Sequence, residues 1–235
     1  MYEVIVLKEG YTKPVQKGHF KAGGSVTLLK GPQNIVVDTG SPWDRELLLN
    51  ALLGQGVEAK DVNFSVCTSG GADKVGNLNL FPEATHIVAS GVCRQGSYFQ
   101  HGFQEGIPYE IDENVEIWPT PGHTGADVSV IVRGTKHGTV AVAGDLFECF
   151  EDLEEPELWQ NSSEQPEQQQ QSRFDVLRVA DAIVPGHGAM FQVPAEYRKQ
   201  MRMVMMQEER YMEECGEGAS VHASFRSECV IVETD

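Results

Sequence analysis

The stretch Thr68-Ser69-Gly70-Gly71-Ala72-Asp73-Lys74-Val75-Gly76-Asn77 decides the fold of this chain. It follows the largely apolar residues 62–67, whose composition predicts a buried strand. Loops at the ends of strands are where a rigid scaffold presents catalytic and binding side chains. Asp73 is therefore the first candidate site residue.

Four further turns place an acid or an imidazole directly after a predicted strand. They are Asp38-Thr39-Gly40, Pro121-Gly122-His123-Thr124, Gly144-Asp145 and Pro185-Gly186-His187-Gly188. Glycine in such turns lets the backbone approach closely and adopt unusual dihedral angles. One turn of this kind is weak evidence, but five in one chain indicate a shared site.

Short strands dominate both halves of the chain. Apolar and β-branched runs predict strands at residues 2–7, 25–30, 34–38, 62–67, 85–89, 115–118, 127–133, 139–143 and 182–184. Helices are expected from Ser41 to Gly54, where Pro42 suits the first helical position, and at residues 172–180 and 195–214. Two strand-rich halves of similar length predict an α/β (α+β) fold, an αββα sandwich of two mixed β-sheets flanked by helices.

At 235 residues the chain is long enough for one domain with a large core. We expect the domain to span residues 1–193, with residues 194–235 forming a C-terminal helix and tail that pack on it. Tyr197, Met201, Val204, Met205 and Met212 recur there at helical spacing. Such a stripe is typical of a core, with a homodimer seam as the alternative.

Composition limits the compartment and the partners. No run approaches the roughly 20 apolar residues that span a bilayer, so no membrane association is expected. Five cysteines without CxxC spacing favour reduced thiols in a cytosol-like compartment. A net charge of −17 disfavours nucleic acid as a partner. Residues 148–171 hold eight acids and no Lys or Arg, which predicts a solvated loop with partial helix.

The five turns and their surroundings resemble the metallo-β-lactamase-fold superfamily, and within it the glyoxalase-II-like branch. The resemblance covers roughly residues 1–193 and extends to residues 36–43, 76–82, 120–123, 142–148 and 184–188. In this family a loop of pattern His-x-His-x-Asp-His supplies most contacts to two zinc ions, and a later His, Asp and His complete the two sites. The resemblance therefore implies a metal-dependent hydrolase.

Only part of that ligand set is present. The metal ligands that match the family pattern are Asp73, His123, Asp145 and His187. The resemblance implies that Asp145 bridges the two metals and that Asp73 is also the catalytic residue that orients the water. It further implies that Asp38 shapes the loop behind the metals. Ser69, Gly71 and Lys74 stand where the family pattern has histidine.

The missing imidazoles leave three outcomes open. The first is no functional metal, because Lys74 repels a cation and can itself pair with Asp73 or Asp145. The second is one weakly held ion on Asp73, Asp145 and His187, whose oxygen-rich character suits manganese or iron better than zinc. The third is rescue by another imidazole, for which His101 is the only candidate, although a local role in its own loop is favoured for it.

Two functions follow from the resemblance. The first is hydrolysis of a phosphodiester or thioester, since a member of this branch is associated with cutting histone pre-messenger RNA; the cytoplasm or nucleus is then the expected location. The second is a non-catalytic homologue that binds a small molecule or a partner protein, or forms a homodimer. The lost ligands favour the second. A serine nucleophile is disfavoured, because no G-x-S-x-G elbow surrounds Ser69.

Overall fold

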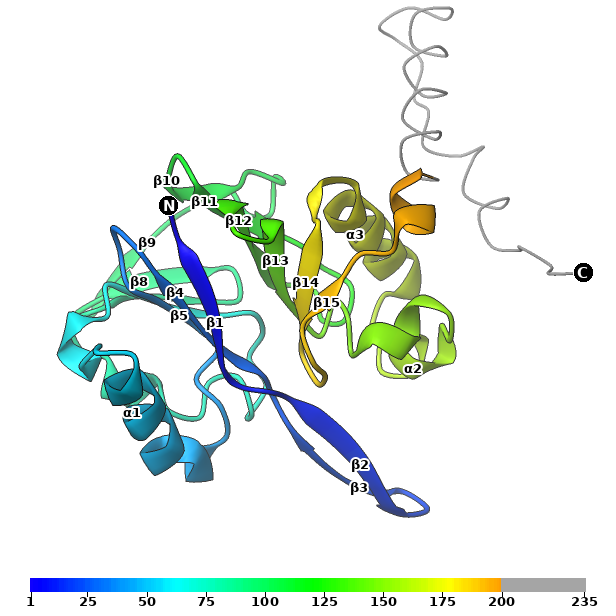
Figure 1. The fold of residues 1–235 in the computed structure, drawn as a ribbon, viewed down its shortest axis with the longest axis horizontal. Helices are drawn as coiled ribbons and strands as arrows, with labels where there is room; N and C mark the ends of the chain where they lie inside the picture. The colour runs from blue at the N-terminus through cyan, green and yellow to red at the C-terminus, as the bar shows by residue number, and fades with distance from the viewer. Residues whose placement is uncertain (200–235) are drawn as a thin grey trace, which may run out of the picture. The chain divides into compact units, whose positions relative to one another are not determined.

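The computed structural model describes residues 1–199 of the chain. Met1–Val193 form one compact unit, in which two sheets lie between α1 on one side and α3 on the other (Figure 1). The first sheet has the order β1-β4-β5-β6-β7-β8-β9. Its strands are β1 (Glu3–Lys8), β4 (Val26–Lys30), β5 (Ile35–Val37), β6 (Phe64–Cys67), β7 (Thr85–Val88), β8 (Gly91–Arg94) and β9 (Ser97–Phe99).

The second sheet has the order β10-β11-β12-β13-β14-β15. Its strands are β10 (Tyr109–Asp112), β11 (Val115–Pro119), β12 (Val128–Thr135), β13 (Gly138–Gly144), β14 (Ala182–Pro185) and β15 (Phe191–Gln192). Both sheets are mixed, because β5, β6 and β7 run parallel in the first sheet and β13 and β14 run parallel in the second. The predicted αββα sandwich is confirmed.

Successive side chains along β5 point to opposite faces of the first sheet and so enter two different hydrophobic cores. Ile35 and Val37 of β5 face the main core between the sheets, where strands of the second sheet contribute residues such as Val130. Val36 lies between them in sequence and faces the opposite side, where it packs with Leu48 and other residues of α1 (Arg45–Gly54). This period of two is the signature of a strand buried on both faces.

Two helical segments differ from the prediction. A 3-10 turn at Pro42–Asp44 precedes α1, with Asp44 accepting a hydrogen bond from the backbone of Ser41 as a capping box does. In the acidic segment, a 3-10 turn (Phe150–Leu153) is followed by α2 (Glu157–Gln160) and α3 (Pro166–Val179). The expected start of α3 at residue 172 is wrong by six residues, since Pro166 opens the helix and four glutamines continue it.

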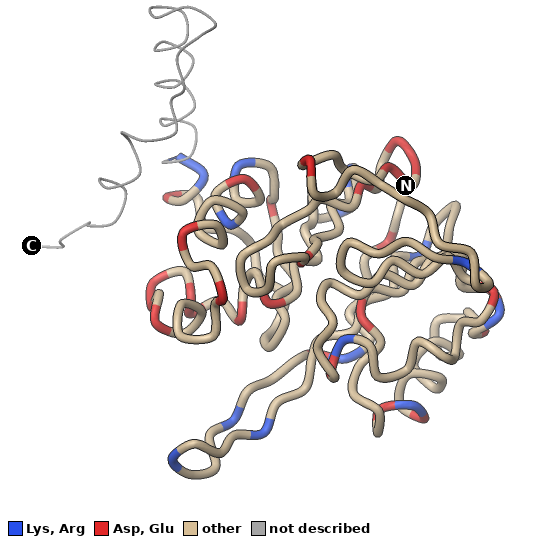
Figure 2. The backbone as a smooth tube through the Cα atoms, turned by 180° about the vertical axis from the view of Figure 1, so that it is seen from behind, with Lys and Arg blue, Asp and Glu red and all other residues tan. Residues whose placement is uncertain are grey.

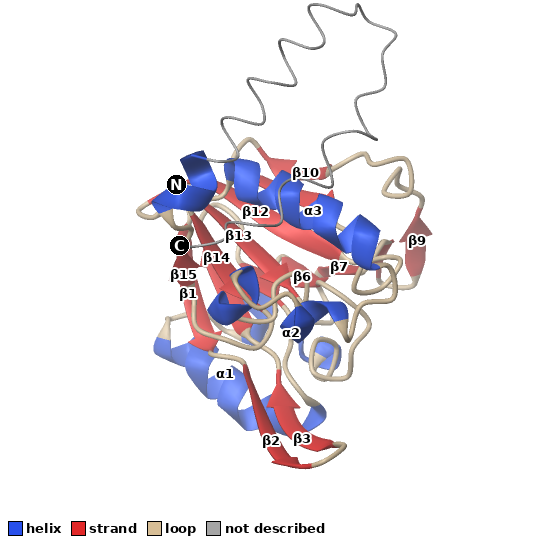
Figure 3. Ribbon diagram, turned by 90° about the vertical axis from the view of Figure 1, so that its right-hand side faces the viewer, coloured by secondary structure: helices blue, strands red, loops and turns tan. Residues whose placement is uncertain are grey.

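The largest addition to the predicted elements is the hairpin of β2 (Tyr11–Gln16) and β3 (His19–Gly23), which projects from the sandwich (Figures 1 and 3). Strands β8, β9, β10 and β15 are also absent from the prediction.

Residues 195–199 are helical and begin the predicted C-terminal helix; Met201, Val204, Met205 and Met212 lie outside the described residues. Within residues 1–199, no helix is long and apolar enough to cross a bilayer.

Candidate functional site

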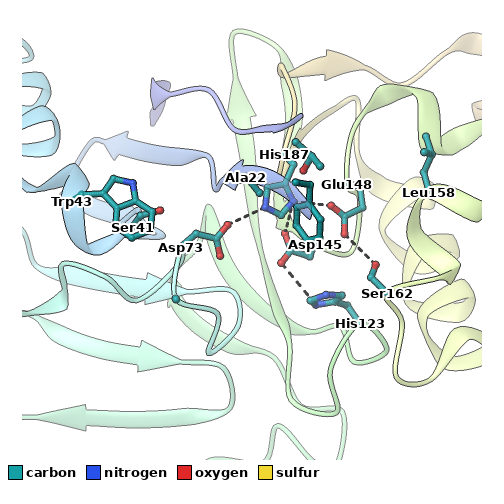
Figure 4. Close-up of a pocket in the computed structure, with 13 residues that line it drawn as sticks. Ala22, Ser41, Trp43, Asp73, His123, Asp145, Glu148, Leu158, Ser162 and His187 are labelled. Carbon is teal, nitrogen blue, oxygen red and sulfur yellow. Dashed lines mark hydrogen bonds and ion pairs between the residues drawn. The ribbon is translucent and has the colours of Figure 1, made fainter. Parts of the chain in front are cut away.

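A pocket of about 460 Å³ opens where loops of the two sheets meet. Figure 4 shows its charged residues drawn together at the centre, with Trp43 and Leu158 on opposite sides. The charged or titratable lining residues are Asp73, His123, Asp145, Glu148 and His187; the apolar ones include Phe20, Ala22, Trp43 and Leu158. All four predicted metal ligands therefore line one pocket, although they come from four separate turns.

The loop after β6 is held in place from behind by the turn at Asp38. Asp38 is buried with a φ of 58°, and its carboxylate accepts hydrogen bonds from the backbone and hydroxyl groups of Thr68. Burial raises the pKa of Asp38 to about 7, although the Lys74 charge opposes the rise. At the other end of the loop, the Asn77 amide donates to the carbonyl oxygens of Thr39 and Ser41 at 2.7 and 2.8 Å. Asp38 thus acts on the loop and not on the pocket itself.

Lys74 is fully buried and points its ammonium at the acids of the pocket. Its Nζ lies 2.8 Å from Asp145 Oδ1 and 3.3 Å from Asp73 Oδ2. Burial alone lowers the pKa of this ammonium, but the carboxylates of Asp145, Asp38 and Asp73 outweigh burial and raise the pKa. Lys74 is therefore a buried cation that joins the loop after β6 to the turn after β13.

His187 is held by carboxylates at both ring nitrogens. Its Nε2 lies 2.9 Å from Asp73 Oδ2, and its Nδ1 lies 2.7 Å from Glu148 Oε2 (Figure 4). Burial lowers the pKa of His187, but the hydrogen bonds to Asp73 and Glu148 prevail and raise it to about 9. The ring is therefore an imidazolium at neutral pH, with a proton on each nitrogen.

His123 is brought to the pocket but is less tightly engaged. Its Nδ1 lies 3.8 Å from both Asp127 Oδ2 and Asp145 Oδ2, and makes no hydrogen bond within residues 1–199. The turn that carries it is fixed by Gly122, whose φ is 147° and where any Cβ would lie 2.2 Å from the Gln169 backbone. This close approach of α3 explains why the turn requires glycine.

None of the remaining candidate positions brings an imidazole into the pocket. Ser69 is buried, and its hydroxyl accepts a hydrogen bond from the backbone of Gly71. His101 is half-buried, contacts the Ile107 carbonyl oxygen at 3.0 Å and packs edge-on against Phe103. Since His101 does not line the pocket, the local role favoured for it agrees with the structure.

Comparison with known proteins identifies the family. No family model matches the chain. Metallo-β-lactamase domain-containing protein 1 of Xenopus laevis is 50% identical over 82% of this chain and 82% of that relative. The Homo sapiens protein of the same name is 45% identical over 83% of this chain and 84% of the relative. The chain belongs to the metallo-β-lactamase domain-containing protein 1 family.

Solved metallo-β-lactamase structures share the fold. A metallo-β-lactamase-like protein of Thermotoga maritima has a TM-score of 0.60 at 18% identity and covers 81% of this chain and 99% of its own. The enzyme FIM-1 of Pseudomonas aeruginosa, in a mono-zinc form, has a TM-score of 0.55 at 14% identity, with 86% and 96% covered. At these identities the likeness shows the fold alone.

The residues of this family member do not fit a pair of metal ions. The ammonium of Lys74 lies against Asp145, the intended bridge, and against Asp73. Both nitrogens of His187 are already bound by carboxylates. Metal ligands must be deprotonated and free to donate an electron pair, whereas here these side chains and Lys74 are joined to one another in a network of ion pairs.

Among residues 1–199, one group of side chains has metal-binding geometry. Ligand atoms of Asp145, Glu148 and His187 all lie within 4.8 Å of one another. Glu148 is absent from the predicted site residues, because it opens the acidic segment, for which the sequence predicts a solvated loop. Its position three residues after Asp145 is the feature that could identify it.

Proposed function

We propose that this chain is a non-catalytic member of its hydrolase family, in which a buried ammonium stands in place of the metal ions. The pocket then binds a small molecule without hydrolysing it. The observation that carries this proposal is the position of Lys74 Nζ, 2.8 Å from Asp145 Oδ1 and 3.3 Å from Asp73 Oδ2.

Electrostatics opposes a divalent ion beside Lys74. At about 4 Å and an effective dielectric constant of about 20, a dication and an ammonium repel by on the order of 8 kcal/mol. The ammonium already offsets part of the negative charge that would attract the ion. A second ion would also need ligands that Ser69 and Gly71 do not supply, because catalytic zinc usually has about three protein ligands.

The shape of the pocket supports a binding role. Phe20, Trp43 and Leu158 contribute apolar surface beside the charged centre. Apolar walls with a few converging polar groups are typical of small-molecule sites, and about 460 Å³ falls within their usual volume. A protein of this fold can therefore keep the pocket for binding without catalysing the reaction of its family.

A second candidate is a hydrolase that uses one weakly held ion. The observation in its favour is the convergence of Asp145, Glu148 and His187. Such an ion would have to displace the ammonium contact of Asp145 and the proton shared between His187 and Glu148. Carboxylate-rich sites of this kind suit manganese or iron better than zinc. The substrate would be a phosphodiester or a thioester, as expected from the sequence.

Metal content and turnover separate the two candidates. We expect the purified chain to contain far less than one equivalent of zinc, manganese or iron by elemental analysis. We also expect no hydrolysis of a phosphodiester or a thioester when these ions are added. Stoichiometric metal, with turnover that disappears in His187→Ala, would overturn the non-catalytic proposal in favour of the second candidate.

A gain of function provides the sharper test. Replacing Ser69, Gly71 and Lys74 together with histidine should raise zinc content to one or two equivalents, because the variant removes the ammonium and restores three ligands. A Cβ at Gly71 would meet only side-chain atoms, the nearest being Asp73 Oδ1 at 3.1 Å. Gly70→His is the matched control, since its Cβ has open space around it. A folded triple variant without zinc would contradict the assignment of these positions.

A further inference from the structure

Each of the three carboxylates that line the pocket approaches the neighbouring cations through one oxygen. Asp73 Oδ2 lies 3.3 Å from Lys74 Nζ and 2.9 Å from His187 Nε2. Asp145 Oδ1 lies 2.8 Å from Lys74 Nζ and 3.4 Å from His187 Nδ1. Glu148 Oε2 lies 2.7 Å from His187 Nδ1. The second oxygen of each carboxylate is not used for these contacts.

Only long contacts surround the second oxygens. Glu148 Oε1 lies 3.4 Å from the hydroxyl oxygen of Ser162, and Asp145 Oδ2 lies 3.8 Å from His123 Nδ1. Asp73 Oδ1 has no hydrogen bond within residues 1–199, and the Asp73 side chain is 25% exposed. An ionised carboxylate accepts hydrogen bonds and cannot donate them. A ligand that binds Asp73 Oδ1 therefore has to supply a donor.

The centre of the pocket holds more negative charge than positive, as the red of this part of the chain in Figure 2 also indicates. Asp73, Asp145 and Glu148 supply three carboxylates, whereas Lys74 and His187 supply two cations. The excess would be larger if the His187 ring were neutral, so its sign does not depend on the protonation of that ring. Charge held away from water is costly unless it is paired. One further positive charge completes the balance.

Trp43 and Ser41 give the pocket features that suit an organic cation. Figure 4 shows both on the Asp73 side of the pocket, with Leu158 on the opposite side. Trp43 is 77% exposed and lines the pocket, and the face of an indole ring attracts cations. Ser41 is buried and lines the pocket, and its hydroxyl has no hydrogen-bond partner within residues 1–199. Together with Phe20 and Leu158, these walls match a ligand with one charged end and an apolar body.

We propose that the pocket binds a primary organic ammonium, which donates a hydrogen bond to Asp73 Oδ1 and lays its apolar body against Trp43. This inference rests on the proposed binding function and gives its ligand a chemical class. An ammonium carries half the charge of a zinc ion and contacts an oxygen that Lys74 does not use. The repulsion that opposes a metal ion is therefore weaker for this ligand. An anionic ligand would meet the excess of carboxylates and is repelled.

Three probes of similar size but different charge test this inference in the full-length chain: phenethylamine, phenethyl alcohol and hydrocinnamate. Each is titrated in the presence of EDTA, and the indole N–H resonances of the three tryptophans report binding. Phenethylamine should bind at least about tenfold more tightly than the alcohol, because charge-assisted hydrogen bonds are roughly twice as strong as neutral ones. Hydrocinnamate should bind most weakly. Trp43 should shift, whereas Trp118 and Trp159 do not line the pocket and serve as internal controls.

Asp73→Asn keeps the shape of the side chain and removes its charge. The variant should bind phenethyl alcohol as the wild type does but lose most of the preference for the amine. A general loss of structure would weaken both probes and would not change the preference alone. Glu157→Gln is the matched control, because Glu157 is exposed and does not line the pocket; this variant should keep the preference.

Three results would each overturn the inference: equal or tighter binding of the alcohol or of hydrocinnamate, no shift of Trp43 with phenethylamine, or an unchanged preference in Asp73→Asn. Elemental analysis and hydrolysis assays on the same sample, before EDTA is added, keep this inference apart from the proposed function. Stoichiometric metal with turnover overturns the proposed function. A metal-free, inactive chain that fails to prefer the amine overturns only the ligand class.

Discussion

Two cations are buried in this domain, and their surroundings differ. Arg173 on α3 donates two hydrogen bonds to the carboxylate of Asp152, at 2.7 and 3.1 Å. Its guanidinium also lies 4.2 Å from the centre of the Phe147 ring and 4.8 Å from that of Trp159. Lys74 has no ring partner among the described residues and contacts two carboxylates, those of Asp145 and Asp73, which line the pocket.

The difference separates an ion pair with matched charges from a cation that faces an excess of carboxylates. Arg173 has one charge and pairs with one carboxylate through two hydrogen bonds, beside the rings of Phe147 and Trp159. Around Lys74 the carboxylates outnumber the cation, since Asp38 also acts on its charge. An excess of converging carboxylates is what a metal site provides. Lys74 therefore occupies surroundings suited to an ion of higher charge, whereas Arg173 occupies surroundings built for a guanidinium.

The largest effect should come from Asp152→Ala. This variant leaves a buried guanidinium that cannot lose its proton, so we expect unfolding to become easier by about 3–5 kcal/mol. Denaturant unfolding measures the change. The double variant Asp152→Ala, Arg173→Met should recover most of the loss, because no charge is then left unpaired. A loss below about 1 kcal/mol in the single variant would remove the basis for calling this pair structural.

Lys74→Met should cost less, about 1–3 kcal/mol, because the acids left behind can take up protons. The cost should rise with pH. Asp38 has a folded-state pKa of about 7, above its unfolded value, and losing the Lys74 charge raises it further. A carboxyl with a raised pKa favours the folded state at low pH, and this stability is lost as pH rises through the folded pKa.

Denaturant unfolding at about pH 6 and about pH 8 checks this dependence. The cost of Lys74→Met should be larger at the higher pH, whereas that of Asp152→Ala should be nearly equal at both. Lys60→Met, at an exposed pair, serves as the control with almost no cost. A pH-independent cost for Lys74→Met would mean that the two buried cations are equivalent after all.

The smallest effect should come from Arg173→Lys, about 1–2 kcal/mol. An ammonium keeps the charge but loses the two-point hydrogen bond and the stacking on Phe147 and Trp159. Arg133→Lys is the control, because the Arg133–Glu116 pair is partly exposed and should contribute less than about 0.5 kcal/mol. Equal costs at the two positions would show that the rings add nothing to the Arg173 site.

Much of the sandwich was predictable because buried strands leave a simple pattern. Runs such as residues 182–184 are apolar at every position, and the structure places them in β14. The β2–β3 hairpin was missed because all residues of β2 are exposed and Pro14 interrupts it, so neither alternation nor hydrophobicity marks the strand. The first turns of α3 were missed because glutamine is common in both loops and helices; burial of Gln169 depends on tertiary contacts with Asp145 and Leu146.

The site was only partly predictable from local motifs. Asp73, His123, Asp145 and His187 were expected in one site and all line the pocket. The partner of His187 was not foreseen, because Glu148 approaches it from a turn 39 residues away in sequence. A pairing of Lys74 with Asp73 or Asp145 was foreseen, but contact with both at once depends on how the two halves of the chain fold together.

Lys74 also changes what holds the two halves of the domain together. Where a bound metal ion holds two loops together, a chelator can take that link away. Here the link is part of the polypeptide, between Lys74 and Asp145, and nothing in the cell's metal supply can withdraw it. The protein should therefore remain equally folded whether its surroundings are zinc-replete or zinc-starved.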